Sequence, residues 1–188
     1  MTLKLSLMRR LFCVVALMAG MMGPAAADQT DPRLDALFEE LRVGDALRAE
    51  ENIGRIIEIW ADAPSDTVDL LYARAELSAE NGAFDLSLTL LDHVVGLAPN
   101  FAQGYALRGE LRLTADDRTG AIQDFMKALE LEPRHFEVRS TLAELLLAGG
   151  EKRDAYDMFQ KVLEWNPHDE NARQRARVLR RELDGQEI

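Results

Sequence analysis

The chain has 188 residues, enough for one domain or at most two, and it carries 22 basic and 33 acidic side chains. A net charge of −11 disfavours nucleic acid and anionic lipid as partners and favours basic ones. The single cysteine, Cys13, lies in an N-terminal apolar run, so the rest of the chain offers no disulfide and no thiol chemistry.

Residues 1–27 have the composition of a secretory signal peptide. Their start carries Lys4, Arg9 and Arg10 without any acid, and the apolar run 11–22 follows. This run is too short to cross a bilayer core of about 30 Å as a helix, and the small residues that follow it end at Ala27. We therefore predict cleavage after Ala27.

Two alternatives concern the same segment. An uncleaved membrane anchor would keep it in place, and the pair Arg9-Arg10 weakly resembles a twin-arginine export signal. A lipid anchor is not expected, because the bulky residues before Cys13 do not suit a lipoprotein cleavage site.

Residues 28–66 predict a pair of helices without a clear repeat pattern. Asp31 suits a helix N-cap, Pro32 suits the first turn, and Gly44 suits the end of the first helix. The apolar stripes of the two helices are Leu34, Leu37, Phe38 and Leu41, then Leu47, Ile53, Ile56, Ile57 and Trp60. The pair is either a cap or an atypical repeat.

Residues 67–169 repeat with a period of 34, the spacing that separates Pro99, Pro133 and Pro167. Small, leucine, bulky and apolar columns keep the same step: Ala75/Gly109/Ala143, Leu77/Leu111/Leu145, Ser87/Ala121/Ala155, Leu91/Phe125/Phe159 and Leu97/Leu131/Trp165. Three copies of one spacing predict three similar structural units.

Each unit is predicted to be a helical hairpin. In the first unit, helices over 67–80 and 84–97 flank Asn81-Gly82, a pair suited to a left-handed C-cap, and Pro99 prevents the second helix from continuing. The same turn holds Gly149-Gly150 in the third unit but Asp116-Asp117 in the second.

This pattern resembles the tetratricopeptide repeat, which has the same period, small residues on both helices and a terminal proline. The resemblance implies an all-α solenoid of three repeats, with residues 28–66 as a degenerate helical pair and 170–188 as a capping helix and tail. Arginines stand where the family often has large apolar residues; we expect their stems to pack and their heads to reach water: Arg74, Arg108, Arg112 and Arg139.

The last helix, about 169–183, combines a thin apolar stripe with many arginines. Ala172, Ala176 and Leu179 belong to the stripe. Terminal repeats need a polar outer face, so this helix is predicted to cap the solenoid. A basic docking site for an acidic partner or a lipid headgroup is the alternative, and the two roles are compatible.

The resemblance also implies a binding surface, because the first helices of this family line the concave face. The residues placed there are Asp69, Tyr72, Glu76, Gln103, Glu110, Glu137 and Glu144. Glu76, Glu110 and Glu144 share one column and would form a ladder of carboxylates. Our hypothesis is recognition of a basic or amide-rich extended segment, with Tyr72 as a flat apolar contact. Alternatively, glutamate recurs there only because it favours helices.

Residues with catalytic or metal-binding chemistry are sparse. His93, His135 and His168 are too far apart in sequence to share a helical face, and no phosphate loop or nucleophile elbow is present. We therefore predict no cofactor, no metal and no enzymatic activity, with an enzyme as an alternative.

The predicted function is a protein-binding scaffold in the periplasm, since signal-bearing proteins of this repeat type are mostly bacterial. An uncleaved N-terminus would instead make the protein a membrane-tethered assembly factor for envelope or cytochrome biogenesis. The sequence does not indicate an oligomeric state.

Overall fold

A computed structural model describes residues 30–185. The predicted signal peptide and its cleavage after Ala27 therefore lie outside the described residues. The described part contains only helices: α2 (Arg33–Val43), α3 (Ala46–Ala61), α4 (Asp66–Glu80), α5 (Phe84–Leu97), α6 (Ala102–Thr114), α7 (Arg118–Leu131), α8 (Phe136–Ala148), α9 (Lys152–Trp165) and α10 (Glu170–Asp184).

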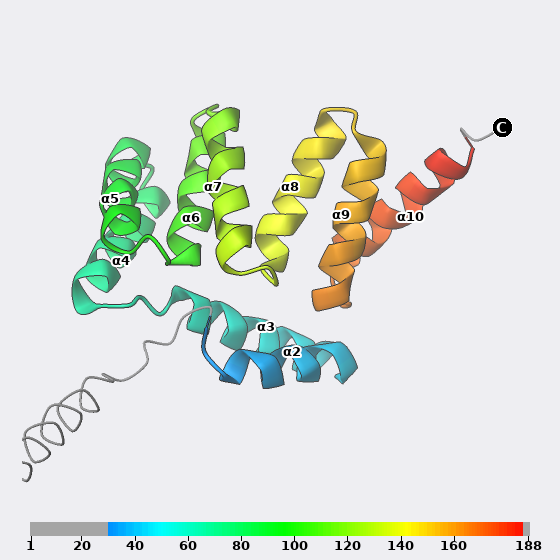
Figure 1. Cartoon of the computed structure of the whole chain (residues 1–188), viewed down its shortest axis with the longest axis horizontal. Coiled ribbons are helices and arrows are strands. Elements are labelled where there is room, and N and C mark those ends of the chain that lie inside the picture. The colour runs from blue at the N-terminus through cyan, green and yellow to red at the C-terminus, as the bar shows by residue number, and fades with distance from the viewer. Residues whose placement is uncertain (1–29, 186–188) are drawn as a thin grey trace, which may run out of the picture.

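Three helical hairpins stand side by side and form a solenoid (Figure 1). The first repeat is α4–α5, the second α6–α7 and the third α8–α9, with α10 packed against α9 at the end. Pro99, Pro133 and Pro167 each follow the end of a second helix by two residues. The predicted all-α solenoid, with an N-terminal helical pair and a C-terminal capping helix, is confirmed.

Small residues allow the two helices of each hairpin to approach closely. A Cβ atom on Gly109 would lie 2.6 Å from Cε1 of Phe125, so the ring occupies the space that a side chain would need. In the first repeat the Ser87 hydroxyl donates to the Ala75 carbonyl oxygen at 2.7 Å. Both side chains are fully buried, which explains why these columns hold small residues.

The turn inside each hairpin needs one residue in the left-handed region. Gly82 (φ 74°) and Gly150 (φ 86°) occupy this position in the first and third repeats, and Asp116 (φ 63°) occupies it in the second. Glycine adopts this conformation without steric cost, and aspartate is one of the few other residues that visit it. The turn without glycine therefore keeps the same backbone shape.

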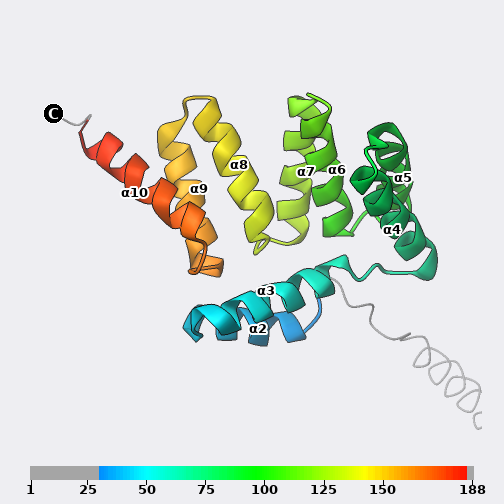
Figure 2. The same cartoon turned by 180° about the vertical axis from the view of Figure 1, so that it is seen from behind.

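The α2–α3 pair does not stack on α4 as a preceding repeat would. It lies across the ends of the solenoid helices, beneath the proline-containing loops (Figures 1 and 2). The Phe38 ring centroid lies 5.7 Å from that of Trp165 and 6.4 Å from that of Phe136. We call this pair the clasp, because it shares one hydrophobic core with α8, α9 and α10.

One consequence of the clasp is an uncovered side on α4. Leu77 is 57% exposed, whereas Leu111, its equivalent one repeat later, is 5% exposed and packs in the core. Leu70 of α4 is also largely exposed. The clasp, which precedes the first repeat in sequence, therefore leaves the outer side of α4 open and covers the proline-containing loops instead.

Candidate binding groove

The residues predicted to line the concave face lie on α4, α6 and α8, the first helices of the three repeats. Tyr72 is only 3% exposed and packs edge-on against Phe101, with ring centroids 5.3 Å apart. Its hydroxyl lies close enough to the side chains of Gln103 and Glu76 for both to influence its pKa. Burial, followed by the nearby charge of Glu76, raises the pKa of Tyr72. The predicted flat contact is therefore corrected: Tyr72 supports the groove from below.

Gln103 is tied to the third repeat. Its Oε1 lies 2.9 Å from Nε2 of His135, which is fully buried and stacks on Trp60 of the clasp at 4.3 Å between centroids. Burial lowers the pKa of His135 to about 3, so the imidazole is neutral at pH 7 and its Nε2–H donates to Gln103. Nδ1 of His135 has no hydrogen-bond partner among the described residues.

Sequence reasoning missed the roles of Trp60 and His135. Trp60 belongs to the helical pair that has no column match, and His135 was considered only as a metal ligand. The presence of an aromatic residue at the equivalent position in the second repeat, Phe101, was the available signal that position 135 is buried.

Three carboxylates lie on the neighbouring helices α4, α6 and α8, on the face predicted to be concave: Glu76, Glu110 and Glu137. All three side chains keep solvent contact, but the concave walls partly desolvate them and raise the pKa of each. The charge of Glu110 further raises the pKa of Glu137. Within residues 30–185 the structure pairs none of the three with a basic side chain. The groove therefore carries uncompensated negative charge.

The two remaining predicted residues lie at the ends of this surface. Asp69 is exposed on the first repeat, close enough to Glu76 to raise its pKa through charge repulsion. Glu144 lies against the capping helix, where it accepts hydrogen bonds from Arg175 Nε at 2.8 Å and Asn171 Nδ2 at 3.4 Å. Glu144 is therefore already paired, and α10 bounds the carboxylate row on that side.

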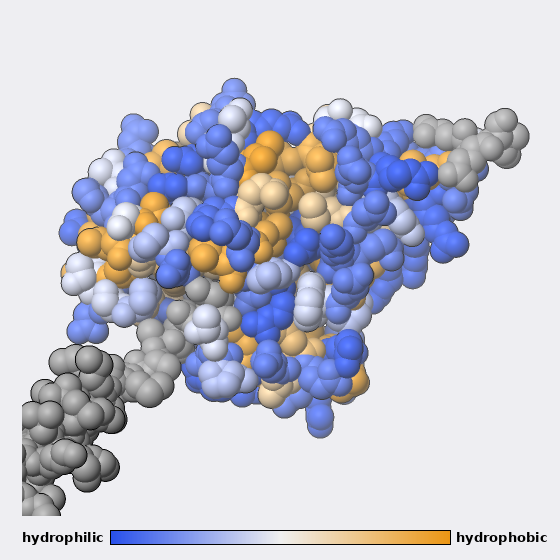
Figure 3. Space-filling model, in the orientation of Figure 1, coloured by the Kyte–Doolittle hydropathy of each residue, from blue (hydrophilic) through white to orange (hydrophobic). Residues whose placement is uncertain are grey.

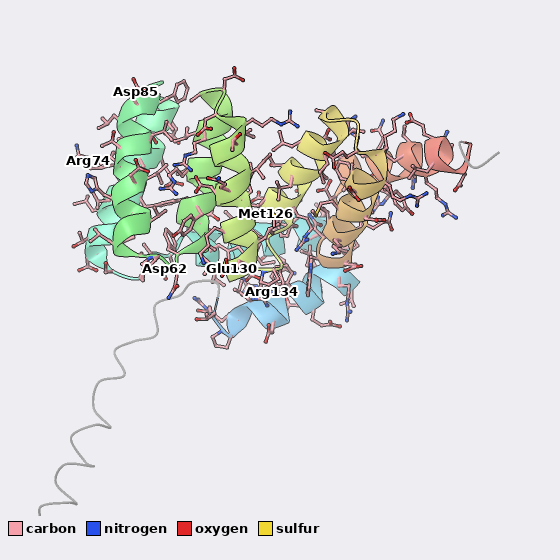
Figure 4. All side chains as sticks on the ribbon, turned by 45° about the horizontal axis from the view of Figure 1, so that its top comes forward. Asp62, Arg74, Asp85, Met126, Glu130 and Arg134 are labelled. Carbon is pink, nitrogen blue, oxygen red and sulfur yellow. The ribbon has the colours of Figure 1, made fainter. Side chains whose placement is uncertain are left out.

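The clasp closes one edge of the repeats through a polar network. Trp60 Nε1 donates to Glu132 Oε2 at 3.3 Å, and Arg134 Nε donates to Glu132 Oε1 at 2.9 Å. Arg134 Nη1 in turn reaches Asp35 of α2 at 2.7 Å, and its guanidinium lies 4.9 Å from the Phe38 ring centroid. Figure 4 shows Arg134 beside the clasp helices.

Two of the arginines differ from the prediction. Arg108 donates to Asp124 through Nε at 2.9 Å, and Arg112 Nη1 donates to the same carboxylate at 2.8 Å. The Asp124 side chain is 4% exposed, so these guanidinium heads turn inward instead of reaching water. The reason is charge pairing, which the apolar columns of the sequence did not reveal.

The described residues contain no group of three or more His, Cys, Asp or Glu side chains arranged to hold a metal ion. None of the helices described in residues 30–185 combines the length and the apolar character needed to cross a membrane.

Comparison with known families matches residues 112–177 to the tetratricopeptide repeat. The described residues therefore have the all-α solenoid fold of the tetratricopeptide repeat, and residues 112–177 match the repeat itself. A TPR repeat-containing protein of Rhizobium etli is 28% identical over 161 residues, which covers 85% of this chain and 79% of the relative. RNA polymerase II-associated protein 3 of Xenopus tropicalis is 39% identical over 51 residues, 27% of this chain and 8% of that protein.

Solved structures of tetratricopeptide-repeat proteins share the fold. The first TPR of Spaghetti, bound to an HSP90 peptide, superposes with a TM-score of 0.58 at 16% identity over 65% of this chain and 97% of that one. The Yersinia enterocolitica secretion chaperone SycD, in complex with a peptide of the translocator YopD, gives 0.58 at 16% identity over 63% and 95%. MamA gives 0.57 at 17% identity over 75% and 86%.

Proposed function

We propose that this protein is a non-enzymatic scaffold whose concave groove binds an extended, basic or amide-rich segment of a partner protein. One observation carries the proposal: Glu76, Glu110 and Glu137 lie near one another on successive first helices, and no basic side chain of the described residues pairs with them. Two fold neighbours are described as bound to peptides, which supports peptide binding as the use of this surface.

The physical reason is the cost of unpaired charge in a partly desolvated site. Like charges at close range raise the free energy of the empty groove, and a cationic segment would lower it by charge-assisted hydrogen bonds. The contact of Gln103 with the buried His135 joins α6 to the start of the third repeat, which should reduce the ordering cost of binding.

The test is charge reversal of the groove in the full chain. A photo-crosslinking amino acid placed at Thr114, on the groove-lining helix α6, captures partners in the native compartment, and mass spectrometry identifies them. The triple variant Glu76→Lys, Glu110→Lys and Glu137→Lys should lose this capture, because it repels a basic segment.

A matched control reverses three exposed acids away from the groove: Glu50→Lys, Glu58→Lys and Asp157→Lys. It changes the net charge equally and should retain capture. Equal capture by the groove variant, or equal loss in the control, would reject the groove as the binding surface.

We also propose that the protein is exported to the periplasm after cleavage at Ala27. The composition of residues 1–27 supports this location. Mass spectrometry of the protein from fractionated cells should show a chain that begins at Asp28. A full-length chain in the membrane fraction would instead support the tethered assembly factor.

A further inference from the structure

The two junctions between repeats have different chemistry at equivalent positions. At the first junction, where α6 packs between α5 and α7, Arg108 bridges Asp92 of the preceding repeat at 2.8 Å and Asp124 of its own repeat at 2.6 Å. Arg112 pairs with Asp124 from one turn further along α6. This set of four charged residues fills the space between the helices.

At the second junction, where α8 packs between α7 and α9, the same four positions are apolar. Adding 34 to the numbers of Asp92, Arg108, Asp124 and Arg112 gives Met126, Leu142, Met158 and Leu146. The shorter side chain of Leu142 does not bridge from α8 to α7 and α9 as Arg108 bridges α5 and α7. A groove of about 770 Å³ remains, lined by Ile122, Met126 and Leu129 of α7, Met158 of α9 and Arg139 of α8.

This groove lies on the side of the second helices, and we call it the convex groove. Figure 3 shows the apolar surface between α7 and α9, and Figure 4 shows Met126 and Glu130 on α7. Met126 is 57% exposed and Ile122 is 36% exposed. Methionine side chains adapt to varied apolar partners, and exposed apolar patches mark interaction sites.

The convex groove is also lined by the polar side chains of Gln123, Lys127 and Glu130 of α7, and by Arg139 of α8. Arg139 is the one whose contacts leave room for a guest. Its Nη1 meets the neutral Met158 sulfur at 3.5 Å and its Nη2 meets the Pro133 carbonyl oxygen. Its buried Nε has no hydrogen-bond partner among the described residues. The nearby acid Glu130 pairs with Lys127 at 3.0 Å, and Glu164 acts on Arg139 only through space. The guanidinium therefore lacks a carboxylate contact, which a guest could provide.

We propose that the convex groove is a second docking site, which binds an acidic amphipathic segment of a partner protein. Apolar side chains of this segment pack between Met126 and Met158, and one carboxylate pairs with Arg139. The guest chemistry is opposite to that of the concave groove, so the two faces select different segments. The scaffold can then hold two partners, or two segments of one partner, at the same time.

The experiment selects ligands without assuming their sequence. A phage-displayed library of random 16-residue peptides is selected against the full chain carrying Glu76→Gln, Glu110→Gln and Glu137→Gln, which removes the negative charge of the concave face without making it basic. The selected peptides should combine large apolar residues with Asp or Glu. In nuclear magnetic resonance spectra of ¹³C-methyl-labelled methionine, they should shift the Met126 and Met158 signals.

Two variants test the assigned contacts. Met126→Glu, at an exposed position, should abolish binding by placing a like charge in the groove. Arg139→Gln should weaken it about tenfold, and replacing the peptide carboxylates by amides should have no further effect on this variant. A Met126→Gln protein serves as the neutral control for the first change.

Several results would overturn the proposal. They are a selection that yields no peptides, peptides that bind Met126→Glu unchanged, and peptides that bind equally with amides in place of carboxylates. Concentration-dependent shifts of Met126 and Met158 without peptide would show that a second copy of the chain occupies the groove, which also contradicts it.

Discussion

The first and second junctions share one backbone arrangement and differ in almost every side chain that fills them. Arg108 and Asp124 lock the first junction with buried ion pairs, whereas Leu142 and Met158 leave the second junction apolar and partly open. Repeat spacing therefore specifies where helices go. The residues at a few matching positions decide whether a junction is closed or available to a partner.

The distance between the packed helices also differs between the two junctions. A Cβ atom on Gly104 would lie 2.9 Å from Cγ1 of Val94, so α6 sits very close to α5. The equivalent residue in the third repeat is Val138, which is buried and occupies space between the helices. Accordingly, α5 packs more extensively against α6 than α7 does against α8.

Removal of the central carboxylate should have the largest effect. Asp124→Ala leaves Arg108 and Arg112 without their shared buried partner, and we expect a loss of about 3–5 kcal/mol in the free energy of unfolding. Urea denaturation measures it. Met158→Ala, at the equivalent position of the second junction, removes no charge partner and should cost less.

A complementary variant copies the second junction into the first. Asp92→Met, Arg108→Leu, Asp124→Met and Arg112→Leu together should be neutral or stabilising, because apolar replacement of the ion network around the buried Asp124 removes its desolvation cost. If this fourfold variant were as unstable as Asp124→Ala, the ion pairs would contribute more than charge compensation.

Overpacking at the close approach should have the next largest effect. Gly104→Ala adds a methyl group against Val94 and Phe101 and should destabilise the protein by about 1–3 kcal/mol. Gly96→Ala in α5 is the control, since open space surrounds this position. It should raise stability by up to about 1 kcal/mol because alanine favours helices. Thermal unfolding of both variants separates packing from helix propensity.

Acid should weaken the second junction selectively. His135 directly precedes α8 and has a folded pKa of about 3, below its unfolded value of about 6.5. As the pH falls, His135 of the unfolded chain binds a proton before His135 of the folded chain does. The contribution of the neutral His135 to folding stability is therefore complete above pH 6.5. It is lost at up to about 1.4 kcal/mol per pH unit as the pH falls towards 3.

The variant His135→Phe copies Phe101, the equivalent residue at the first junction, and cannot titrate. Its stability between pH 7 and 5.5 should fall less than that of the parent chain. The raised pKa values of Glu76, Glu110 and Glu137 act in the opposite direction as the pH falls, since protonation removes the cost of desolvating their charges, and this effect is common to both proteins. Parallel pH profiles for the two proteins would contradict a buried neutral His135.

The sequence was sufficient for the solenoid but not for the clasp. Columns such as Ala75, Gly109 and Ala143 encode hairpin packing locally, so periodicity reveals the repeats. The stacking of Trp60 on His135 joins distant segments and obeys no period. Nothing in the pattern of residues 28–66 therefore indicates which repeat the pair will cover.

The sequence predicts which helix face each candidate residue occupies, but not how deeply its side chain is buried. Helical spacing puts Tyr72 and Glu76 on one face of α4, but burial of Tyr72 depends on Phe101, which follows the first repeat. Likewise, the pairing of Glu144 with Arg175 depends on how α10 docks. Contacts between successive helices decide which predicted residues remain available to a partner.

The contact of Phe38 with Trp165 ties the first described helix, α2, to α9 of the last repeat. An open array can fray one unit at a time from either end, because each unit touches only its neighbours. Here the last repeat cannot peel away without releasing the first helix of the described chain as well. Hydrogen exchange should therefore show α2, α3 and α9 opening together as one cooperative unit. The helix α4, whose outer side is not covered by another helix, should open more readily.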